Sequence, residues 1–327
     1  MTLPLLEVDG LTVEFATAAG SFRAADDVSF ALGTGEVLGL VGESGSGKTV
    51  TCRALMRLLP SRQARVVAGS VRIDGVDLMA LAEAEMMRVR GVTIGMIFQN
   101  PMTHLDPVMT VGDQIAEPLR VRGLSRTAAR ERAVDLLRQV GIPDPGSRVR
   151  SYPHEFSGGM RQRAMIAAAL ACGPKLLIAD EPTTALDVTV QAQILRLLLE
   201  LRDRVGLAII LISHDLGVVA QICDTIAVMY AGRIVERADK RTLLRRPLHP
   251  YTVGLIGSQP GAAPPLQELP SIQGQPPSLI DLPRGCSFHP RCALAEPACR
   301  ESPPPLVEVA PGHHTACLRW RVLEGVA

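Results

Sequence analysis

The stretch Gly42-Glu43-Ser44-Gly45-Ser46-Gly47-Lys48-Thr49 decides the fold. It fits the pattern of Gly, four residues and Gly-Lys-Ser/Thr, which is typical of loops that bind nucleoside triphosphates. The apolar run Val37 to Val41 precedes it and indicates a buried strand. The residues Thr49 to Leu59 follow it and can form an amphipathic helix. Because strand, loop and helix stand in the order that the motif requires, we prefer a phosphate-binding loop to an ordinary glycine-rich turn.

The residue types of this loop suit phosphate chemistry. Glycines let the backbone fold closely around a phosphate and point successive N–H groups inward. The helix that starts near Gly47 adds unpaired N–H groups and the positive end of its dipole. Lys48 can reach the β- and γ-phosphates, and the Thr49 hydroxyl can coordinate Mg²⁺. The predicted nucleotide contacts are Gly42, Glu43, Ser44, Gly45, Ser46, Gly47, Lys48, Thr49 and Val50.

The composition excludes some classes of function. The 327 residues carry a formal net charge of +1, so no general affinity for nucleic acid is expected. No apolar run approaches the roughly 18 residues that a membrane-spanning helix needs. The N-terminus lacks the basic start of a signal peptide. We therefore expect a soluble, cytosolic protein.

The chain changes character along its length. Residues 1 to about 75 indicate short strands around one helix, whereas helical patterns dominate residues 100 to 165. From residue 175 apolar strands alternate again with helices, and this alternation predicts a mainly parallel sheet covered by helices. Residues 260 to 284 are rich in Pro, Gly and Gln and are typical of a linker. A cysteine-bearing tail follows.

Two further motifs carry chemistry. The apolar run Leu176 to Ala179 ends in Asp180 and Glu181. A carboxylate at such a strand end can hold Mg²⁺, and the next one can orient or deprotonate an attacking water. Ser157-Gly158-Gly159 stands at the start of a predicted helix, where its N–H groups could bind an anion or the serine could simply cap the helix.

In this order the motifs resemble those of the ATP-binding subunits of ABC transporters, over about residues 5 to 240. The loop at residues 42 to 49 matches Walker A, Asp180 the Walker B aspartate and Glu181 the catalytic glutamate. Ser157-Gly158-Gly159 matches the signature motif, and Gln99 matches the Q-loop. Ala185-Leu186-Asp187 matches the D-loop, and His214 matches the switch histidine. Phe15 is the best match for the aromatic that stacks on adenine, and Phe22 is a weaker one. The signature departs from the usual pattern, since it has Phe156 and Met160 where Leu and Gln are common.

The resemblance implies an α/β fold. It comprises a RecA-like P-loop NTPase core with an antiparallel β subdomain (residues 1–99 and 166–240), an α-helical signature subdomain (100–165) and a C-terminal extension (241–327). It implies ATP and Mg²⁺ as ligands, with Thr49, Gln99 and Asp180 around the metal. Catalysis would depend on Lys48, Gln99, Glu181 and His214. In this family two subunits face each other head to tail, and each ATP lies between one Walker A loop and the partner's signature helix, with Asp187 nearby.

Other stretches resemble the peptide-importer branch. They are Glu155 to Arg163, Asn100 to Thr103 and His249 to Thr252. The resemblance implies an ATPase that powers import of di- or oligopeptides from the cytoplasmic side of the inner membrane. Its expected partners are two transmembrane permease subunits, a second ATPase subunit, identical or paralogous, and indirectly an extracytoplasmic substrate-binding protein. One alternative is the same ATPase role for another substrate, such as nickel, glutathione or another small solute. A second alternative is a soluble ABC ATPase without a transporter. Nucleic acid is not an expected partner.

Four cysteines cluster near the C-terminus. Cys286, Cys292, Cys299 and Cys317 are separated by five, six and seventeen residues. Disulfides, zinc or an iron–sulphur cluster are the physical options, and a cytosolic location argues against stable disulfides. Peptide-importer ATPases with this tail resemble iron–sulphur binders, so a [4Fe–4S] cluster is favoured, with Zn²⁺ as the alternative. We expect the P-loop not to depend on this tail.

Overall fold

The computed structural model describes residues 4–324, apart from 19, 100–103, 185 and 260–270. Asn100 to Thr103 and Ala185, used above, therefore lie outside the described residues. The chain forms two compact units. We call residues 1–33, 37–80 and 212–327 the loop unit, and residues 34–36 and 81–211 the signature unit. The P-loop, His214 and the four cysteines near the C-terminus belong to the loop unit, whereas Gln99, the signature residues and the acidic pair belong to the signature unit.

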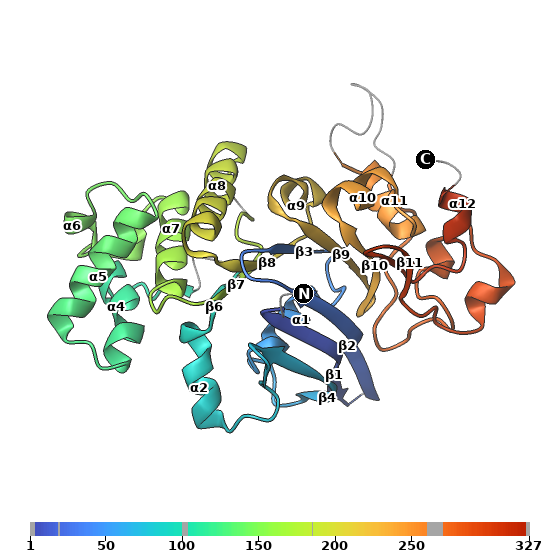
Figure 1. Ribbon diagram of the computed structural model, residues 1–327, viewed down its shortest axis with the longest axis horizontal. Coiled ribbons are helices and arrows are strands. Elements are labelled where there is room, and N and C mark those ends of the chain that lie inside the picture. The colour runs from blue at the N-terminus through green and yellow to red at the C-terminus, as the bar shows by residue number, and fades with distance from the viewer. Residues whose placement is uncertain (1–3, 19, 100–103, 185, 260–270, 325–327) are drawn as a thin grey trace. The chain divides into compact units, whose positions relative to one another are not determined.

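The loop unit contains two groups of strands (Figure 1). An antiparallel sheet in the order β2-β1-β4-β5 is built from β1 (Leu6–Thr17), β2 (Gly20–Leu32), β4 (Ala64–Ile73) and β5 (Val76–Asp77). The second group has the order β11-β12-β10-β9-β3. It consists of β3 (Val37–Val41), β9 (Thr225–Tyr230), β10 (Arg233–Asp239), β11 (Val307–Ala310) and β12 (His313–Thr315). Its β3–β9 pair is parallel and its other described pairs are antiparallel.

Strand β3 is the centre of the loop unit's core. All five of its residues are buried, as its continuous apolar sequence predicts. Gly39 in this strand allows α9 to pack closely, because a Cβ there would lie 2.2 Å from the Val219 Cγ1 atom. The helices of this unit are α1 (Lys48–Leu55), α9 (Leu216–Ile222), α10 (Lys240–Arg245), α11 (Pro250–Gly257) and α12 (Trp320–Glu324), with 3₁₀ turns at His289–Arg291 and Pro297–Arg300.

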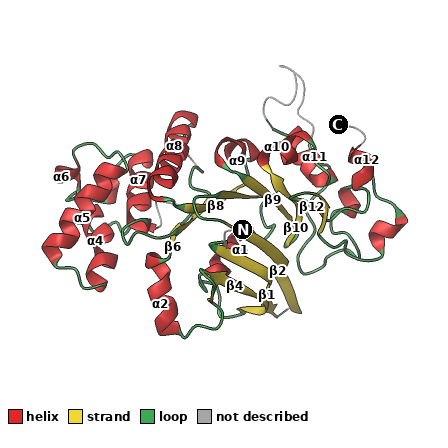
Figure 2. Ribbon diagram, in the orientation of Figure 1, coloured by secondary structure: helices red, strands yellow, loops and turns green. Residues whose placement is uncertain are grey.

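The signature unit combines short buried strands with a helical group (Figure 2). Its strands follow the order β8-β7-β6, with β6 (Ile94–Ile97) parallel to β7 (Leu176–Asp180). β8 is Ala208–Ser213, of which the residues up to 211 belong to this unit. The helices are α2 (Glu83–Val92), α4 (Val111–Val121), α5 (Arg126–Gln139), α6 (Pro145–Arg148), α7 (Gly158–Ala169) and α8 (Val188–Val205), with a 3₁₀ turn at Pro153–Glu155. In α5 the four residues Ala129, Ala133, Leu136 and Leu137 form the buried face.

The structure confirms an α/β fold with an antiparallel subdomain. It corrects the expectation of a mainly parallel sheet, because the second group of strands in the loop unit is mixed. In that group only the β3–β9 pair is parallel among the described pairs. Helix α2 extends to Val92 through non-helical residues at Arg90 and Gly91, and β6 begins at Ile94. The C-terminal extension, in which the sequence indicated only a linker and a cysteine segment, contains α11, α12, β11, β12 and most of α10. Among the described residues, no helix has the length and hydrophobicity required to cross a membrane.

Candidate functional site

The P-loop connects the end of β3 to the start of α1. Two of its glycines are required by their surroundings as well as by their backbone conformation. Gly42 has a φ of 152°, and a Cβ there would lie 2.2 Å from the Met229 carbonyl oxygen. Gly47 has a φ of 100°, and its Cβ would lie equally close to the Ala24 carbonyl oxygen. The loop therefore packs against β9 and β2 at positions that only glycine can occupy.

The Lys48 side chain points back into the loop. Its Nζ donates hydrogen bonds to the carbonyl oxygens of Gly42 and Glu43, both at 2.8 Å, and to Ser46 Oγ at 3.1 Å. Lys48 is only 5% exposed, so its ammonium group is held at the concave side of the loop. Lys48 and Thr49 are the first two residues of α1, followed by Val50. This geometry places a positive charge, a hydroxyl group and the N-terminus of a helix at one place, which suits a polyphosphate with a bound cation.

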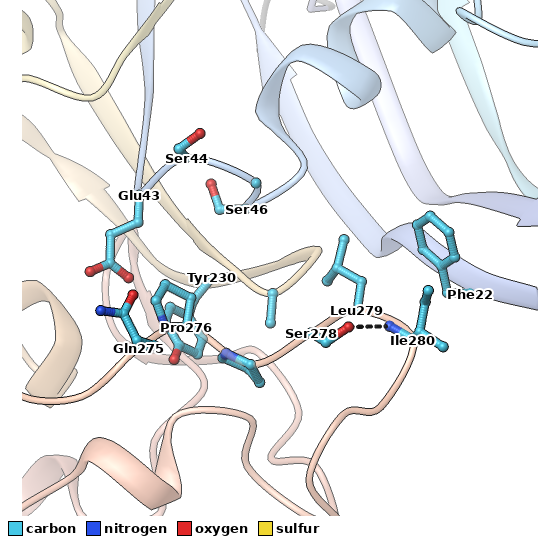
Figure 3. A pocket seen from close by; sticks show the side chains of 13 residues that line it. Phe22, Glu43, Ser44, Ser46, Tyr230, Gln275, Pro276, Ser278, Leu279 and Ile280 are labelled. Atoms are coloured by element: carbon cyan, nitrogen blue, oxygen red, sulfur yellow. Dashed lines mark hydrogen bonds between the residues drawn. The ribbon is translucent and has the colours of Figure 1, made fainter. Parts of the chain in front are cut away.

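A cavity of about 690 Å³ lies beside the loop (Figure 3). Its size falls in the range of small-molecule sites. Glu43, Ser44, Gly45 and Ser46 line one part of it, and Phe22 lines another. Phe22 is paired across β1 and β2 with Phe15, and the two rings stack with centroids 5.3 Å apart. Phe22, the weaker sequence candidate, therefore faces the cavity, whereas Phe15 packs on Phe22 and is not among the lining residues.

The signature unit holds the acidic pair at the end of β7. Asp180 is fully buried, and Glu181 follows it with a φ of 47°. That backbone region is uncommon for residues other than glycine and is often found at functional sites. Glu181 Oε2 accepts hydrogen bonds from Gln99 Nε2 and from Thr184 Oγ1, each at 2.9 Å. The predicted Q-loop glutamine and catalytic glutamate are thus in direct contact.

The signature and D-loop residues also lie close together. Ser157 caps α7 by accepting a hydrogen bond from the Met160 N–H group, and Asp187 caps α8 in the same way through Val190. A Cβ on Gly159 would lie 2.7 Å from Val190 Cγ1, and one on Gly158 would lie 3.7 Å from Leu186 Cδ2. The start of α7 therefore packs closely on α8 at Gly159, while Gly158 is exposed.

His214 stands between β8 and α9 in the loop unit. Its side chain is exposed, and the flanking residues fix the turn. The Asp215 N–H group donates to Ser213 Oγ at 3.0 Å, and Asp215 Oδ1 caps α9 by accepting from Gly217 at 2.8 Å. The predicted switch histidine is therefore held on a defined turn at a strand end.

Two families of known proteins match the chain. Residues 25–184 match the ABC transporter family, and residues 235–299 match the C-terminal region of oligopeptide/dipeptide transporters. A probable peptide ABC transporter ATP-binding protein of Sinorhizobium fredii is 54% identical over 324 residues, which cover 98% of this chain and 96% of that protein.

The chain belongs to the ATP-binding subunits of peptide-import ABC transporters. The dipeptide transport ATP-binding protein DppD of Escherichia coli is 48% identical over 316 residues and 96% of each chain. Among solved structures, a dimeric post-hydrolysis ATP-binding cassette with bound ADP and Pi superimposes with a TM-score of 0.65 at 26% identity. That match covers 72% of this chain and 99% of the cassette. The chain is therefore an ABC ATPase coupled to transport.

The four cysteines of this ABC subunit line one small cavity. Cys286, Cys292, Cys299 and Cys317 border it together with His249 and other residues, and none forms a disulfide. The Cys286 N–H group donates to the Cys299 carbonyl oxygen at 2.8 Å, which joins two of the four by backbone. Burial raises the pKa of the Cys317 thiol to about 12. Within the described parts of the chain, no three His, Cys, Asp or Glu side chains are arranged to hold a metal ion.

The tail reaches the Walker A loop, which the sequence analysis did not foresee. Arg291 forms an ion pair with Glu43, and the Glu43 N–H group donates to the Tyr251 hydroxyl at 2.8 Å. Residues 275–280 line the cavity beside the loop. The expectation that the loop is independent of the tail is therefore wrong at the level of contacts. Tyr251 stood in a stretch that indicated the peptide-importer branch, whereas no sequence pattern marks Arg291.

Proposed function

We propose that this subunit binds and hydrolyses ATP to drive import of di- and oligopeptides across the cytoplasmic membrane, on whose cytoplasmic face it would sit peripherally. The observation that supports it most strongly is the Lys48 side chain, which points into the P-loop, in a chain whose C-terminal region matches that of oligopeptide and dipeptide transporters. The relatives named above carry peptide or dipeptide transport in their names over nearly the whole chain. The RecA-like topology of the core is part of this proposal.

The chemistry follows from the residues of each unit. Lys48 and the N-terminus of α1 would bind the β- and γ-phosphates, while Thr49, Asp180 and Gln99 would surround Mg²⁺. Glu181 would act as general base toward the attacking water, because two hydrogen bonds hold its carboxylate in one orientation. His214 would sense the γ-phosphate. The assignments of these residues derive from their match to the family motifs.

A partner would complete the site. The N–H groups at Ser157-Gly158-Gly159 would close over the γ-phosphate of a second subunit's ATP, with Asp187 at the contact. The second subunit could be identical or paralogous. Two transmembrane permease subunits would dock near Gln99, and a substrate-binding protein would deliver peptide on the far side of the membrane. The dimeric cassette described above supports a two-subunit arrangement.

Reconstitution would test the transport function. The chain should co-purify with two membrane subunits, and the complex in proteoliposomes should show ATP hydrolysis that rises when peptide-loaded binding protein is added. A complex carrying Glu181→Gln is the matched control and should assemble without transporting. Stimulation by nickel or glutathione instead of peptide would assign another solute, and failure to associate with any permease would overturn the proposal.

We also propose that the tail holds a [4Fe–4S] cluster on Cys286, Cys292, Cys299 and Cys317. The donor set supports it, because four thiols that form no disulfide line one cavity. A cluster bound there would link four segments of the tail and could respond to redox conditions. Protein purified without oxygen should be brown and contain about four iron and four sulphide per chain. Colourless protein with stoichiometric zinc would replace the cluster by a zinc site, and protein without metal would refute both.

A further inference from the structure

Two residues of the C-terminal extension, Arg291 and Tyr251, bond to Glu43, the second residue of the Walker A loop. Arg291 donates to both carboxylate oxygens of Glu43, from Nη1 at 2.7 Å and from Nη2 at 3.0 Å. Tyr251, which is fully buried, accepts the Glu43 backbone N–H group. The Arg291 side chain is 5% exposed and that of Glu43 is 27% exposed, so this bidentate pair is largely shielded from water. Side chain and backbone of Glu43 are therefore both fixed by the extension.

The same guanidinium group holds a second segment of the extension. Arg291 Nε donates to the Gln273 carbonyl oxygen at 2.9 Å, and Nη2 donates to that of Ile272 at 3.2 Å. The Tyr230 and Phe288 rings flank it, each with its centroid 5.9 Å from Cζ. Arg291 thus ties the start of the segment 272–280 to the P-loop, and a lysine could not replace this fork of donors.

The segment that Arg291 anchors continues as a wall of the cavity beside the loop (Figure 3). Its lining residues are Gln275, Pro276, Pro277, Ser278, Leu279 and Ile280. The two prolines restrict the backbone, and Ser278 Oγ accepts the Ile280 N–H group at 3.3 Å. Ile280 is 51% exposed, which is high for a large apolar side chain beside the Phe22 ring. The cavity therefore has a polar side at the phosphate loop and an apolar side made by Phe22 and the extension.

We propose that residues 275–280 of the extension bind the nucleoside part of the nucleotide, and that Arg291 positions them through Glu43. This inference rests on nucleotide binding at the P-loop. When phosphates occupy the loop, the attached nucleoside enters the adjoining cavity, whose apolar lining suits a flat heterocycle. Leu279 and Ile280 contribute apolar contact area, and the anchored, proline-bearing backbone lowers the entropy lost on binding. An extension known by its cysteines would thus supply part of the nucleotide site in the same chain.

The test separates the nucleoside from the phosphates. Calorimetry on the full-length chain with Mg²⁺ would compare ADP with inorganic pyrophosphate, neither of which is hydrolysed at the Walker site. The double variant Leu279→Ser/Ile280→Ser should weaken ADP about 5- to 10-fold and pyrophosphate less than about 2-fold, since only apolar contacts are lost. Leu282→Ser, an apolar-to-serine change just beyond the segment and outside the lining, is the matched control and should change neither affinity.

The positioning role of Arg291 has its own readout. Like the double variant, Arg291→Lys should weaken the binding of ADP more than the binding of pyrophosphate. When Arg291→Lys is combined with the double variant, the total loss of ADP affinity should be smaller than the sum of the two separate losses in free energy. Glu43→Gln, which weakens the pair from the other side, serves if Arg291→Lys fails to fold. Unchanged ADP affinity, equal losses for ADP and pyrophosphate, or additive effects would each overturn the proposal. Wild-type protein that binds neither ligand would instead refute nucleotide binding at the loop itself.

Discussion

The P-loop and the cysteine tail belong to the same compact unit, yet contacts of very different range hold them. Lys48 bonds to groups two, five and six positions away along the chain. Arg291 in the tail bonds to Glu43 across 248 positions, and His313 bonds to Glu236 across 77. The Lys48 ammonium group is therefore held by neighbours within its own loop, whereas Arg291 and His313 hold the tail through residues far away in the chain.

Glu236 shows how the tail is anchored. This carboxylate is fully buried in β10 and accepts hydrogen bonds from the Leu248 and His249 N–H groups at 2.6 and 2.9 Å. It also contacts His313 Nε2 at 2.8 Å. Burial lowers the pKa of His249 to about 3, so its ring is neutral and its Nδ1 accepts the Tyr251 N–H group. One buried acid thus joins α11 and β12, and α11 carries the tyrosine that holds Glu43.

Substitution of Lys48 should give the largest difference between the two regions. Lys48→Ala removes the charge that faces the β- and γ-phosphates, and several charge-assisted hydrogen bonds disappear with it. We expect ATP affinity to fall by roughly 100-fold or more. The metal content of the tail should not change. Calorimetry and iron analysis on the same preparation would check both, with Lys240→Ala as the control, and affinity within a few-fold of wild type would contradict the loop assignment.

Substitution of Glu181 should separate binding from turnover. Glu181→Gln should slow ATP hydrolysis about 10²–10⁴-fold, because a positioned base is lost, while ATP still binds. ATP should then hold a long-lived dimer with an identical or paralogous subunit, visible by size-exclusion chromatography with Mg-ATP. Thr184→Ala removes the hydrogen bond from Thr184 but leaves the one from Gln99, and it should have a smaller effect on rate. An unchanged elution volume with every candidate partner present would argue against the sandwich dimer.

The cysteines should differ among themselves. Each of Cys286→Ser, Cys292→Ser, Cys299→Ser and Cys317→Ser should weaken or abolish iron binding. Cys292 follows Arg291 directly, so its substitution should also lower ADP affinity by a few-fold, whereas Cys317→Ser should leave that affinity closer to wild type. Absorption spectra of anaerobic protein and calorimetry with ADP would measure the two effects. Equal ADP affinity in all four variants would show that the tail's metal state does not reach the loop.

The same contrast explains what could be predicted from the sequence. Lys48 and the residues that cap α7 and α8 bond to neighbours within a few positions, so their spacing carries their geometry. Gln99 and Glu181 lie 82 positions apart. The strand end before Glu181 already indicated a carboxylate that could act on water, whereas only the family resemblance indicated a role for Gln99. Neither local spacing nor the family resemblance indicated the Arg291–Glu43 pair. An arginine beside a cysteine and a glutamate inside a loop have no pattern that joins them, and only the folded chain brings them together.

The two stacked phenylalanines should differ in their effect on ADP affinity. Phe15 matched the adenine-stacking aromatic by sequence, but the Phe22 ring lines the cavity and Phe15 packs against it. Phe22→Ala should weaken ADP about 5- to 10-fold, since a stacked aromatic pair contributes about 0.5–1.5 kcal/mol beyond its buried area. Phe15→Ala should cost only about 2-fold, because it acts by loosening Phe22. Phe22→Leu is the control that keeps apolar area without the ring. A larger loss at Phe15 than at Phe22 would restore the sequence assignment and would mean that the strand pair shifts when nucleotide binds. An effect at Phe22 that disappears in the Leu279→Ser/Ile280→Ser background would instead show that Phe22 and the distant tail segment contact the same base.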